Sequence, residues 1–303
     1  MNAHLVSAYQ QCFAEPQRSQ KRLYEMAKRD QWNSDALPWD RLDFSALPRP
    51  LREALAGLCA HVHYGEVASL LAAARAVEQA DDSETRLFAS TQVIDEARHV
   101  EWFTRLQHKL APPEPPTVHE TVTALVDSVY ASHDPDELCL GMQLIVEGLA
   151  QTLFQEAARA LRAVDRALCG APQGGGEAPV PTEPATAAGL LADWLVNYIA
   201  RDESRHVAFG VVQLGQRLRR LPPSRIDALQ AKVVVWGRLL HAIPAAFEPR
   251  FATLGIDTLR LAGDCISDLN LHLRQAGLEV QIAAPTALYV TSEGAASTPG
   301  PTT

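Results

Sequence analysis

The sequence DEARHV, residues Asp95 to Val100, occurs a second time as DESRHV, residues Asp202 to Val207. In each copy a glutamate precedes a histidine by three positions, and residues with this spacing lie on one face of an α-helix. One such pair is a weak signal, because glutamate and histidine are common on helix surfaces. Two copies that agree at five of six positions favour two facing helices that direct carboxylates and imidazoles toward one site.

Two isolated glutamates add to this pattern. Glu66, in YGEVASLL, and Glu147, in LIVEGLA, each lie among small or apolar residues on the helix that precedes a copy of the repeat. A charged carboxylate in such surroundings is costly unless it is paired or bound to a metal ion. An ion pair with Arg98 or Arg205 is the alternative explanation. Glu78 competes with Glu66 on the same helix, but it lies near the helix end, where we expect it to be exposed.

The combined set contains four carboxylates and two imidazoles, namely Glu66, Glu96, His99, Glu147, Glu203 and His206. One glutamate from each of two helices, with Glu-x-x-His from each of two others, is the ligand arrangement of di-iron carboxylate bundles. Oxygen-rich ligation with one nitrogen per ion suits iron or manganese better than zinc or copper. The sequence therefore predicts a site for two iron ions, with an iron–manganese pair as the alternative.

Charged residues beside these candidate ligands are expected to support them. A metal-bound histidine uses one ring nitrogen for the metal and is oriented through the other. Asp95 and Asp202, which directly precede the ligand glutamates, are therefore predicted to accept hydrogen bonds from the ligand histidines. Arg98 and Arg205 are predicted to pair with these aspartates or with the ligand carboxylates. Ordinary salt bridges on the helix surface are the alternative for both arginines.

The composition of the chain favours helices. Of its 303 residues, 47% are hydrophobic but only 6% are aromatic, and β-branched runs are sparse. Helical patterns form two long hairpins, over residues 49–110 and 134–219. Shorter helices are predicted over residues 118–132, 224–242 and 256–275. We therefore predict an all-α protein with one bundle domain, residues 49–275.

The segments outside the hairpins have other compositions. Residues 1–48 are expected to form N-terminal helices and an irregular arm packed on the bundle, with Trp32 and Trp39 as buried anchors. Contact with a substrate is the alternative role for these two tryptophans. The Gly/Pro-rich residues 170–187 predict a mobile loop, and residues 276–303 a disordered tail, with a short strand near residues 280–282 as an alternative.

Charge and cysteine content exclude several classes of protein. The formal net charge of −9 argues against a nucleic-acid partner. The five cysteines form no CxxC pair, which is typical of thiols in a reducing compartment. The N-terminus lacks the pattern of a signal peptide, and no apolar run approaches the ~18 residues of a membrane span. We expect a soluble cytoplasmic protein.

The repeats in their context, DEARHVEWF and DESRHVAFG, resemble the ferritin-like di-iron oxygenase and oxidase superfamily when they are taken with the two isolated glutamates. The resemblance covers residues 49–219 and implies a ferritin-like four-helix bundle with accessory helices. The superfamily includes ribonucleotide reductase small subunits, R2-like ligand-binding oxidases, bacterial multicomponent monooxygenases and arylamine N-oxygenases.

The chain departs from the first two of these branches. Phe103 stands where a radical-forming reductase subunit would have a tyrosine, and Glu66 stands where such a subunit would usually have an aspartate. The valine and tyrosine that form a cross-link in the ligand-binding oxidases would fall at Ser69 and Met142. Neither the tyrosyl radical nor the cross-link is therefore expected.

The other two branches do not fit completely either, so the branch stays open. Ile199 replaces the additional histidine of the N-oxygenases, and Gln151 replaces the threonine of the multicomponent monooxygenases. The general resemblance implies an enzyme that activates O₂ to hydroxylate, N-oxygenate or desaturate a small organic substrate. It also implies an electron-donating reductase or ferredoxin as partner, and a homodimer is possible.

Two alternatives to an oxygenase remain. One is a ferroxidase or iron-handling protein without an organic substrate, and the other is a metal-free helical scaffold. Apolar residues near the ligands in sequence are candidates to line a substrate pocket, and packing in the bundle core is the alternative for them. These residues are Val100, Phe103, Ile145 and Phe209.

Overall fold

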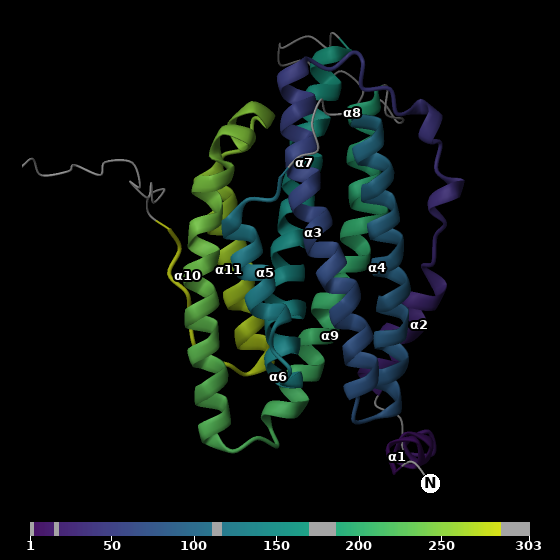
Figure 1. Ribbon diagram of the computed structural model, residues 1–303, viewed down its shortest axis with the longest axis vertical. Coiled ribbons are helices and arrows are strands. Elements are labelled where there is room, and N and C mark those ends of the chain that lie inside the picture. Colours follow the sequence, from purple (N-terminus) through teal and green to yellow (C-terminus); the bar gives the residue numbers. More distant parts are fainter. Residues whose placement is uncertain (1–2, 15–17, 111–116, 170–185, 286–303) are drawn as a thin grey trace, which may run out of the picture.

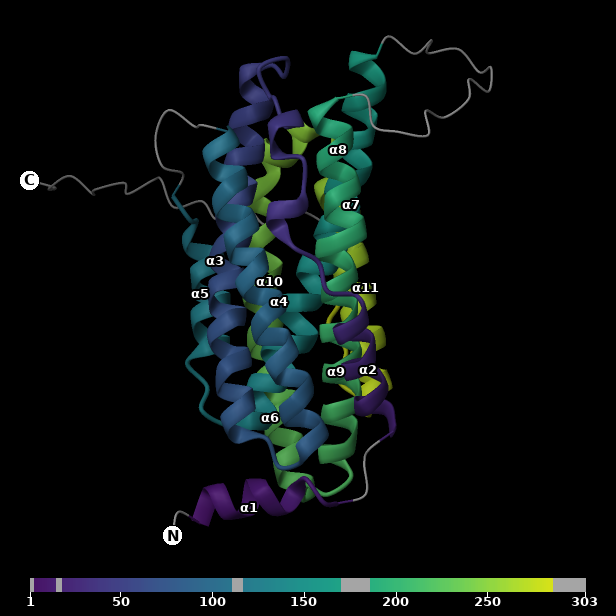
Figure 2. The ribbon, with the colours of Figure 1, turned by 90° about the vertical axis from the view of Figure 1, so that its right-hand side faces the viewer.

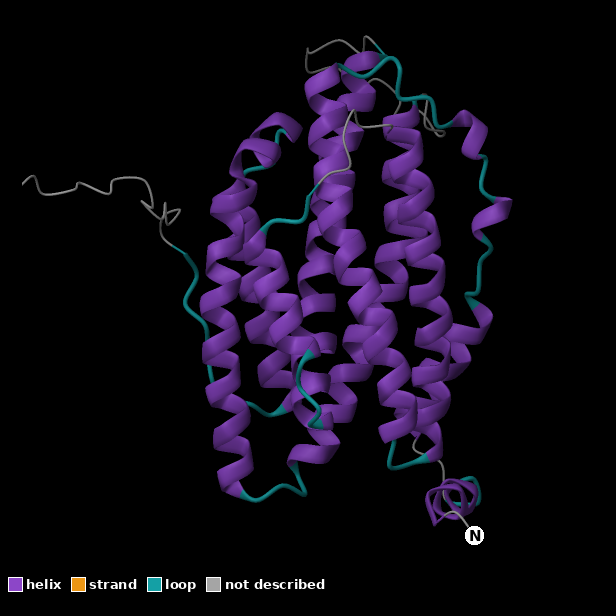
Figure 3. Ribbon diagram, in the orientation of Figure 1, coloured by secondary structure: helices purple, strands orange, loops and turns teal. Residues whose placement is uncertain are grey.

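Long helices running side by side make up the computed structural model, which describes residues 3–14, 18–110, 117–169 and 186–285 (Figure 1). No strand occurs within these ranges (Figure 3). None of the helices they contain is long and apolar enough to span a membrane.

Two antiparallel hairpins form the centre of the bundle. The first consists of α3 (Arg49–Gln79) and α4 (Ser83–Leu110). The second begins with α6 (Pro135–Leu138), the π-helical segment η3 (Cys139–Val146) and α7 (Glu147–Leu168). It returns through α8 (Ala187–Trp194), the π-helical segment η4 (Leu195–Ile199) and α9 (Ala200–Leu218).

Capping side chains fix where these helices begin. The Asp134 carboxylate accepts hydrogen bonds from the backbone N–H groups of Asp136 and Glu137, which opens the second hairpin. At the turn of the first hairpin, Asp82 Oδ1 accepts a hydrogen bond of 2.7 Å from the backbone N–H of Thr85. Both caps satisfy donors that have no partner within the helix.

Both helical arms of the second hairpin contain a π-helical turn that the sequence did not predict. The backbone N–H of Glu147 bonds to the carbonyl of Met142, five residues earlier. The N–H of Ala200 bonds in the same way to the carbonyl of Leu195. Each π-helical turn ends shortly before a candidate ligand, and such turns are frequent at functional sites.

Accessory helices cover the hairpins on two sides. On one side lie α5 (Glu120–Tyr130), α10 (Pro223–Leu254) and α11 (Thr258–Ala276) (Figure 1). On the side of α4 and α9 lie α2 (Arg18–Arg29) and the arm, with the short helices η1 (Ser34–Ala36) and η2 (Trp39–Arg41). The first helix, α1 (Ala3–Gln11), crosses one end of the bundle (Figure 2).

The predicted end of the helix over residues 224–242 was wrong, because α10 continues through Pro244 and Pro249 to Leu254. A proline inside a helix costs about 3 kcal/mol. Phe247 and Phe251, both buried, offset this cost, since burying one such side chain contributes about 1.5–3 kcal/mol. The helix stops at Gly255, whose φ of 72° lies in the left-handed region.

The alternative of a short strand near residues 280–282 is not realised. The backbone N–H and carbonyl of Ile282 instead bond to the side-chain amide of Asn270 on α11, at 2.9 and 2.8 Å. Residues 277–285 lie against the bundle, where Leu278 and Ile282 are buried. Residues 286–303 of the predicted tail and residues 170–185 of the predicted loop lie outside the described residues, so their mobility stays a prediction.

Candidate metal centre

The two hairpins bring all six predicted ligands together inside the bundle. Glu66 comes from α3, Glu96 and His99 from α4, Glu147 from the start of α7, and Glu203 and His206 from α9. Glu66 is 4% exposed and the other five are at most 2% exposed. The rival Glu78 is exposed near the end of α3, as expected.

The six side chains form two overlapping groups. One contains Glu66, Glu96, His99 and Glu203, and the other contains Glu96, Glu147, Glu203 and His206. Within each group the ligand atoms lie within 4.8 Å of one another. Glu96 and Glu203 belong to both groups, whereas each histidine and each isolated glutamate belongs to one. This arrangement suits two metal ions that share two bridging carboxylates.

Both histidines turn the same ring nitrogen toward the carboxylates. His99 Nδ1 lies 3.1 Å from Glu203 Oε1 and 3.2 Å from Glu66 Oε2. His206 Nδ1 lies 3.0 Å from Glu96 Oε1 and 3.0 Å from Glu203 Oε2. The Nδ1 atoms are therefore the candidate metal-binding nitrogens, and the Nε2 atoms face away from the glutamate carboxylates.

Each Nε2 atom meets an aspartate from the other copy of the repeat. His206 Nε2 lies 3.4 Å from Asp95 Oδ2, and His99 Nε2 lies 3.5 Å from Asp202 Oδ2. The sequence predicted both aspartates as hydrogen-bond acceptors for the ligand histidines. Asp95 lies within hydrogen-bond distance of His206, whereas His99 Nε2 lies opposite Asp202 without a hydrogen bond. The sequence did not indicate that the pairing would cross between α4 and α9.

The two arginines join these aspartates in one charged network. Arg205 Nη2 lies 2.5 Å from Asp202 Oδ1 and 3.3 Å from Asp95 Oδ2. Arg98 pairs with Asp95, and its Nη2 lies 3.4 Å from Asp202 Oδ2. Their side chains are only 3% and 11% exposed, so these contacts differ from the surface salt bridges of the alternative interpretation.

The electrostatics of the cluster favour bound cations. Burial and the charge of Glu147 raise the pKa of Glu203 to about 8. Burial and the charge of Glu203 raise the pKa of Glu66 well above its ordinary value. Burial alone would lower the pKa of His99, but the charges of Glu66 and Glu203 raise it well above the ordinary value. Glu96 Oε2 and Glu203 Oε1 are buried without a hydrogen-bond partner.

These features fit a pair of divalent ions. Four buried carboxylates repel one another, and two divalent cations would balance their charge. The two carboxylate oxygens that have no hydrogen-bond partner could also bind these ions. The cluster of carboxylates and histidines is therefore suited to a two-metal site.

Two glutamines beside the ligands were missed at the level of sequence. Gln92 Nε2 lies 3.2 Å from Glu96 Oε1 and 3.4 Å from Glu147 Oε1, within hydrogen-bond reach of both. Gln143 Nε2 donates to Gln92 Oε1 at 2.9 Å. Each glutamine stands four positions before a ligand glutamate, which is one helical turn. That spacing was the available signal.

Trp32 on the arm also reaches the charged network. Its indole Nε1 donates a hydrogen bond of 2.8 Å to Asp202 Oδ2, and its ring is stacked 6.4 Å from the ring of His99. The sequence predicted Trp32 as a buried anchor, and it is indeed packed against the core. Its bond to Asp202 joins residues 170 positions apart, so no local pattern could reveal it.

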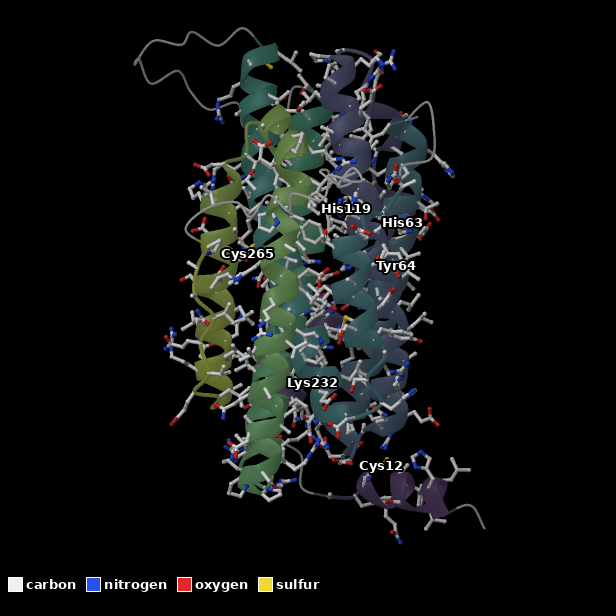
Figure 4. All side chains as sticks on the ribbon, turned by 60° about the vertical axis from the view of Figure 1, so that its left-hand side comes forward. Cys12, His63, Tyr64, His119, Lys232 and Cys265 are labelled. Carbon is white, nitrogen blue, oxygen red and sulfur yellow. The ribbon has the colours of Figure 1, made fainter. Side chains whose placement is uncertain are left out.

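A largely apolar cavity of about 110 Å³ adjoins the candidate metal centre. Its wall includes Glu66 and Glu147, one from each group of ligands. Helices α3, α5, α7, α10 and α11 supply most of the rest, including Val62, Val126, Leu153, Leu240, Phe247 and Ile266. In Figure 4, Cys265, which also lines the cavity, lies on one side of the ribbon of α10 and His119 lies on the other.

His61 in this wall is neutral. Its Nε2 accepts a hydrogen bond of 2.8 Å from the backbone N–H of His119, so the proton is on Nδ1, which donates to the carbonyl of Gly57. Burial lowers the pKa of His61, in agreement with a neutral ring. Both ring nitrogens are occupied, so His61 contributes its ring surface to the cavity and is not a free base.

The apolar residues nominated from sequence do not line this cavity. Phe103, Ile145 and Phe209 are buried, and Val100 is absent from the cavity wall. Core packing, the alternative for them, is therefore correct for Phe103 and Ile145, whereas Phe209 lines a separate, smaller cavity. The cavity forms instead between α3 and the accessory helices, whose contribution depends on how they dock.

Comparison with known proteins identifies the fold. No protein-family model matches the chain, and no curated protein matches its sequence. An R2-like ligand-binding oxidase variant with an aerobically reconstituted Mn/Fe cofactor is 23% identical, with a TM-score of 0.56 over 84% of this chain and 93% of that chain. Dimanganese(II)-NrdF from Streptococcus sanguinis is 13% identical, with a TM-score of 0.68 over 90% and 92%. The fold is thus the ferritin-like helical bundle, and the predicted all-α class is confirmed.

Proposed function

We propose that this chain is a non-haem dimetal oxygenase that uses O₂ to oxidise a small, largely apolar organic molecule. The observation that carries the proposal is the position of the cavity, because its apolar wall ends at Glu66 and Glu147. A molecule in this cavity would lie beside both candidate metal positions. Hydroxylation, N-oxygenation and desaturation are all compatible with this arrangement.

The metals in this proposal are two iron ions, with an iron–manganese pair as the alternative. The Mn/Fe and dimanganese cofactors of the structural neighbours support a two-metal site that contains iron or manganese, as do the four carboxylates and two imidazoles of the site. When bound, the reduced ions would supply the electrons and the open coordination positions that O₂ activation requires. Further electrons would come from a separate reductase or ferredoxin.

The chain itself would position the ions and exclude water. Glu96 and Glu203 would bridge the two ions, and Glu66 and Glu147 would each bind one of them on the side of the cavity. Asp95 would hold His206 through its outer nitrogen, which fixes the direction of the imidazole. The apolar wall would keep the reacting carbon or nitrogen atom in a dry environment.

A ferroxidase without an organic substrate is the alternative. A ferroxidase needs no apolar cavity beside its metal ions, whereas this chain has a largely apolar cavity of about 110 Å³ there. This difference favours the oxygenase. Cytoplasmic location and a homodimeric state remain predictions from sequence.

Isotope labelling tests the proposal. Protein loaded with Fe(II) without oxygen is exposed to ¹⁸O₂ and a chemical reductant in the presence of a panel of apolar compounds. Incorporation of ¹⁸O into a compound, or its dehydrogenation, is expected and is measured by mass spectrometry. Consumption of O₂ with iron as the only oxidised product, whatever compound is added, would instead establish the ferroxidase.

A variant that fills the cavity tests whether the substrate binds there. Leu153→Trp fills the cavity and is expected to abolish product formation while two metal ions still bind. Leu87→Trp places the same side chain at a position that is 42% exposed on α4 and should retain activity. Equal activity in both variants would show that the substrate does not occupy this cavity.

A further inference from the structure

A second, smaller cavity lies near the candidate metal centre and differs from the first in its wall. It measures about 40 Å³ and includes none of the six predicted ligands. Its polar side chains include Thr85, Gln143, Gln213 and Arg217. About 10–15 Å³ of such volume is enough to hold one water molecule, provided that polar partners are available.

Two buried amides connect this cavity to the predicted ligands. Gln143, in the cavity wall, donates from Nε2 to Gln92 Oε1 at 2.9 Å. The Nε2 of Gln92 then lies within hydrogen-bond reach of Glu96 and Glu147. Gln92 is 1% exposed and Gln143 is 4% exposed. The connection therefore runs through the protein interior.

Gln143 has an unused acceptor. Its Oε1 is buried and has no hydrogen-bond partner. An unsatisfied buried polar atom costs about 1–3 kcal/mol, which a water molecule in the adjoining cavity would remove.

The rest of the polar wall is held in place by its own hydrogen bonds. Thr85 Oγ1 donates to Gln213 Oε1 at 2.9 Å, and Gln20 Nε2 donates to these two oxygens at 3.0 and 2.6 Å. Arg217, whose side chain is 20% exposed, extends the wall toward solvent and pairs with Asp136. The wall of this cavity thus contains both a partly exposed polar side chain and the buried Gln143.

The walls of the two cavities are in contact at Ser69 and Met142. Ser69 lines the apolar cavity and Met142 lines the second one. The Ser69 hydroxyl donates to Met142 Sδ at 3.4 Å, and both side chains are buried. Water in the second cavity would therefore be kept apart from a molecule in the apolar cavity.

We propose that the second cavity holds water and that Gln143 and Gln92 connect this water to the metal centre, as a polar entrance separate from the apolar cavity. The purpose of this entrance rests on the proposed function. Insertion of one oxygen atom from O₂ into a C–H bond consumes two electrons and two protons and releases one water molecule. A separate polar route carries protons and water while the substrate cavity stays dry.

The experiment uses Mn(II) as a probe of solvent access, without O₂ or substrate. Mn(II)-loaded protein is mixed with D₂O and frozen at increasing times, and electron spin echo modulation reports deuterons near the ion. Gln143→Leu is expected to slow their appearance at least tenfold. Leu153→Trp, which fills the apolar cavity, is expected to leave the rate unchanged.

A second variant and a second measurement test the proposal independently, in case Gln143→Leu disturbs folding. Thr85→Val keeps the shape of the side chain but removes a hydroxyl from the far part of the wall, and it should slow exchange to a smaller degree. A crystal structure of the wild type should show a water within hydrogen-bond distance of Gln143 Oε1. Unchanged exchange in both polar variants, equal slowing in Leu153→Trp, or a dry cavity would overturn the proposal.

These outcomes are independent of turnover. A chain that oxidises no organic compound could still exchange water through Gln143, and an active oxygenase could exchange water elsewhere. Failure of the polar entrance and failure of the oxygenase proposal are therefore distinguished.

Discussion

Asp95 lies 3.4 Å from Nε2 of His206, although these residues belong to different copies of the repeated sequence. The reciprocal distance, from Asp202 to His99 Nε2, is 3.5 Å. Each copy therefore supplies a histidine to one candidate metal position and the aspartate that faces the histidine of the other. This exchange couples α4 to α9, so neither half of the centre is complete on one hairpin.

The crossed pairing predicts a specific pattern of energetic coupling. Asp95→Asn should weaken metal binding by about 10–100-fold, as is typical when the partner of a ligand histidine is lost. This loss should disappear in a His206→Ala background and persist in a His99→Ala background. Competition titration with a fluorescent chelator measures both cycles. The reverse pattern would mean that each aspartate acts within its own copy.

Metal stoichiometry tests which carboxylates are shared. Glu147 belongs to one group of ligands, so Glu147→Ala should reduce the iron or manganese content toward one ion per chain. Glu203 belongs to both groups, so Glu203→Ala should weaken both positions. Elemental analysis after loading and desalting gives the numbers. Glu78→Ala, at an exposed position on α3, is the control and should retain both ions. Equal losses in the Glu147 and Glu203 variants would contradict the assignment.

Metal affinity should rise with pH. The pKa of Glu203 is about 8 in the metal-free cluster, and the pKa values of His99 and His206 are also raised. All three must release a proton to bind a metal ion, so protons compete below pH 8. The apparent affinity for Mn(II) should therefore increase at least about tenfold from pH 6 to 7. Titrations at constant ionic strength measure it, and an affinity independent of pH would exclude Glu203 as a ligand.

The metal-free protein should be stabilised by removing a ligand. The pKa of Glu203 is raised from 4.5 to about 8 in the folded chain, so its ionisation costs stability as the pH rises through this range. Glu203→Gln should therefore raise the free energy of unfolding by on the order of 1–3 kcal/mol at pH 8, and by little at pH 4. Urea unfolding with a chelator present measures the difference. Metal should stabilise the wild type but not this variant.

Close packing between α9 and η3 can be tested at Gly210. A Cβ atom there would lie 2.4 Å from Gln143 Cβ and 2.6 Å from Leu144 Cδ1. Gly210→Ala should destabilise the protein by about 1–3 kcal/mol and displace Gln143. Gly263→Ala on α11 meets nothing within 4 Å and should be neutral or stabilising by about 0.5–1 kcal/mol. Thermal unfolding compares the two variants, and a neutral Gly210→Ala would show that the helices lie farther apart.

Much of the centre was predictable because its ligand spacing is local. The three-residue separation of Glu96 from His99, and of Glu203 from His206, places each pair on one helix face whatever the rest of the chain does. The apolar surroundings of Glu66 and Glu147 likewise marked them as buried carboxylates. All six predicted ligands converge for these reasons, and helical periodicity also predicted the two hairpins.

Local spacing gave no information about the cavity. Phe103 and Phe209 lie near ligands in sequence, but neither lines the apolar cavity. Phe103 packs in the bundle core, and Phe209 lines the smaller second cavity. The wall of the apolar cavity includes Phe247, on a part of α10 that follows Pro244 and was not predicted to be helical. Burial in the tertiary structure decided that this helix continues.

The sequence by itself determined the fold class, the candidate ligand residues and the kind of metal that suits their donor atoms, since these follow from periodicity within single helices and from donor chemistry. Only the tertiary structure decided that Glu96 and Glu203 are shared, that Asp95 faces His206, and that Gln143 meets Gln92. Those relationships depend on the distance and rotation between helices far apart in the chain. Packing of the whole bundle sets these quantities, and no local pattern encodes them.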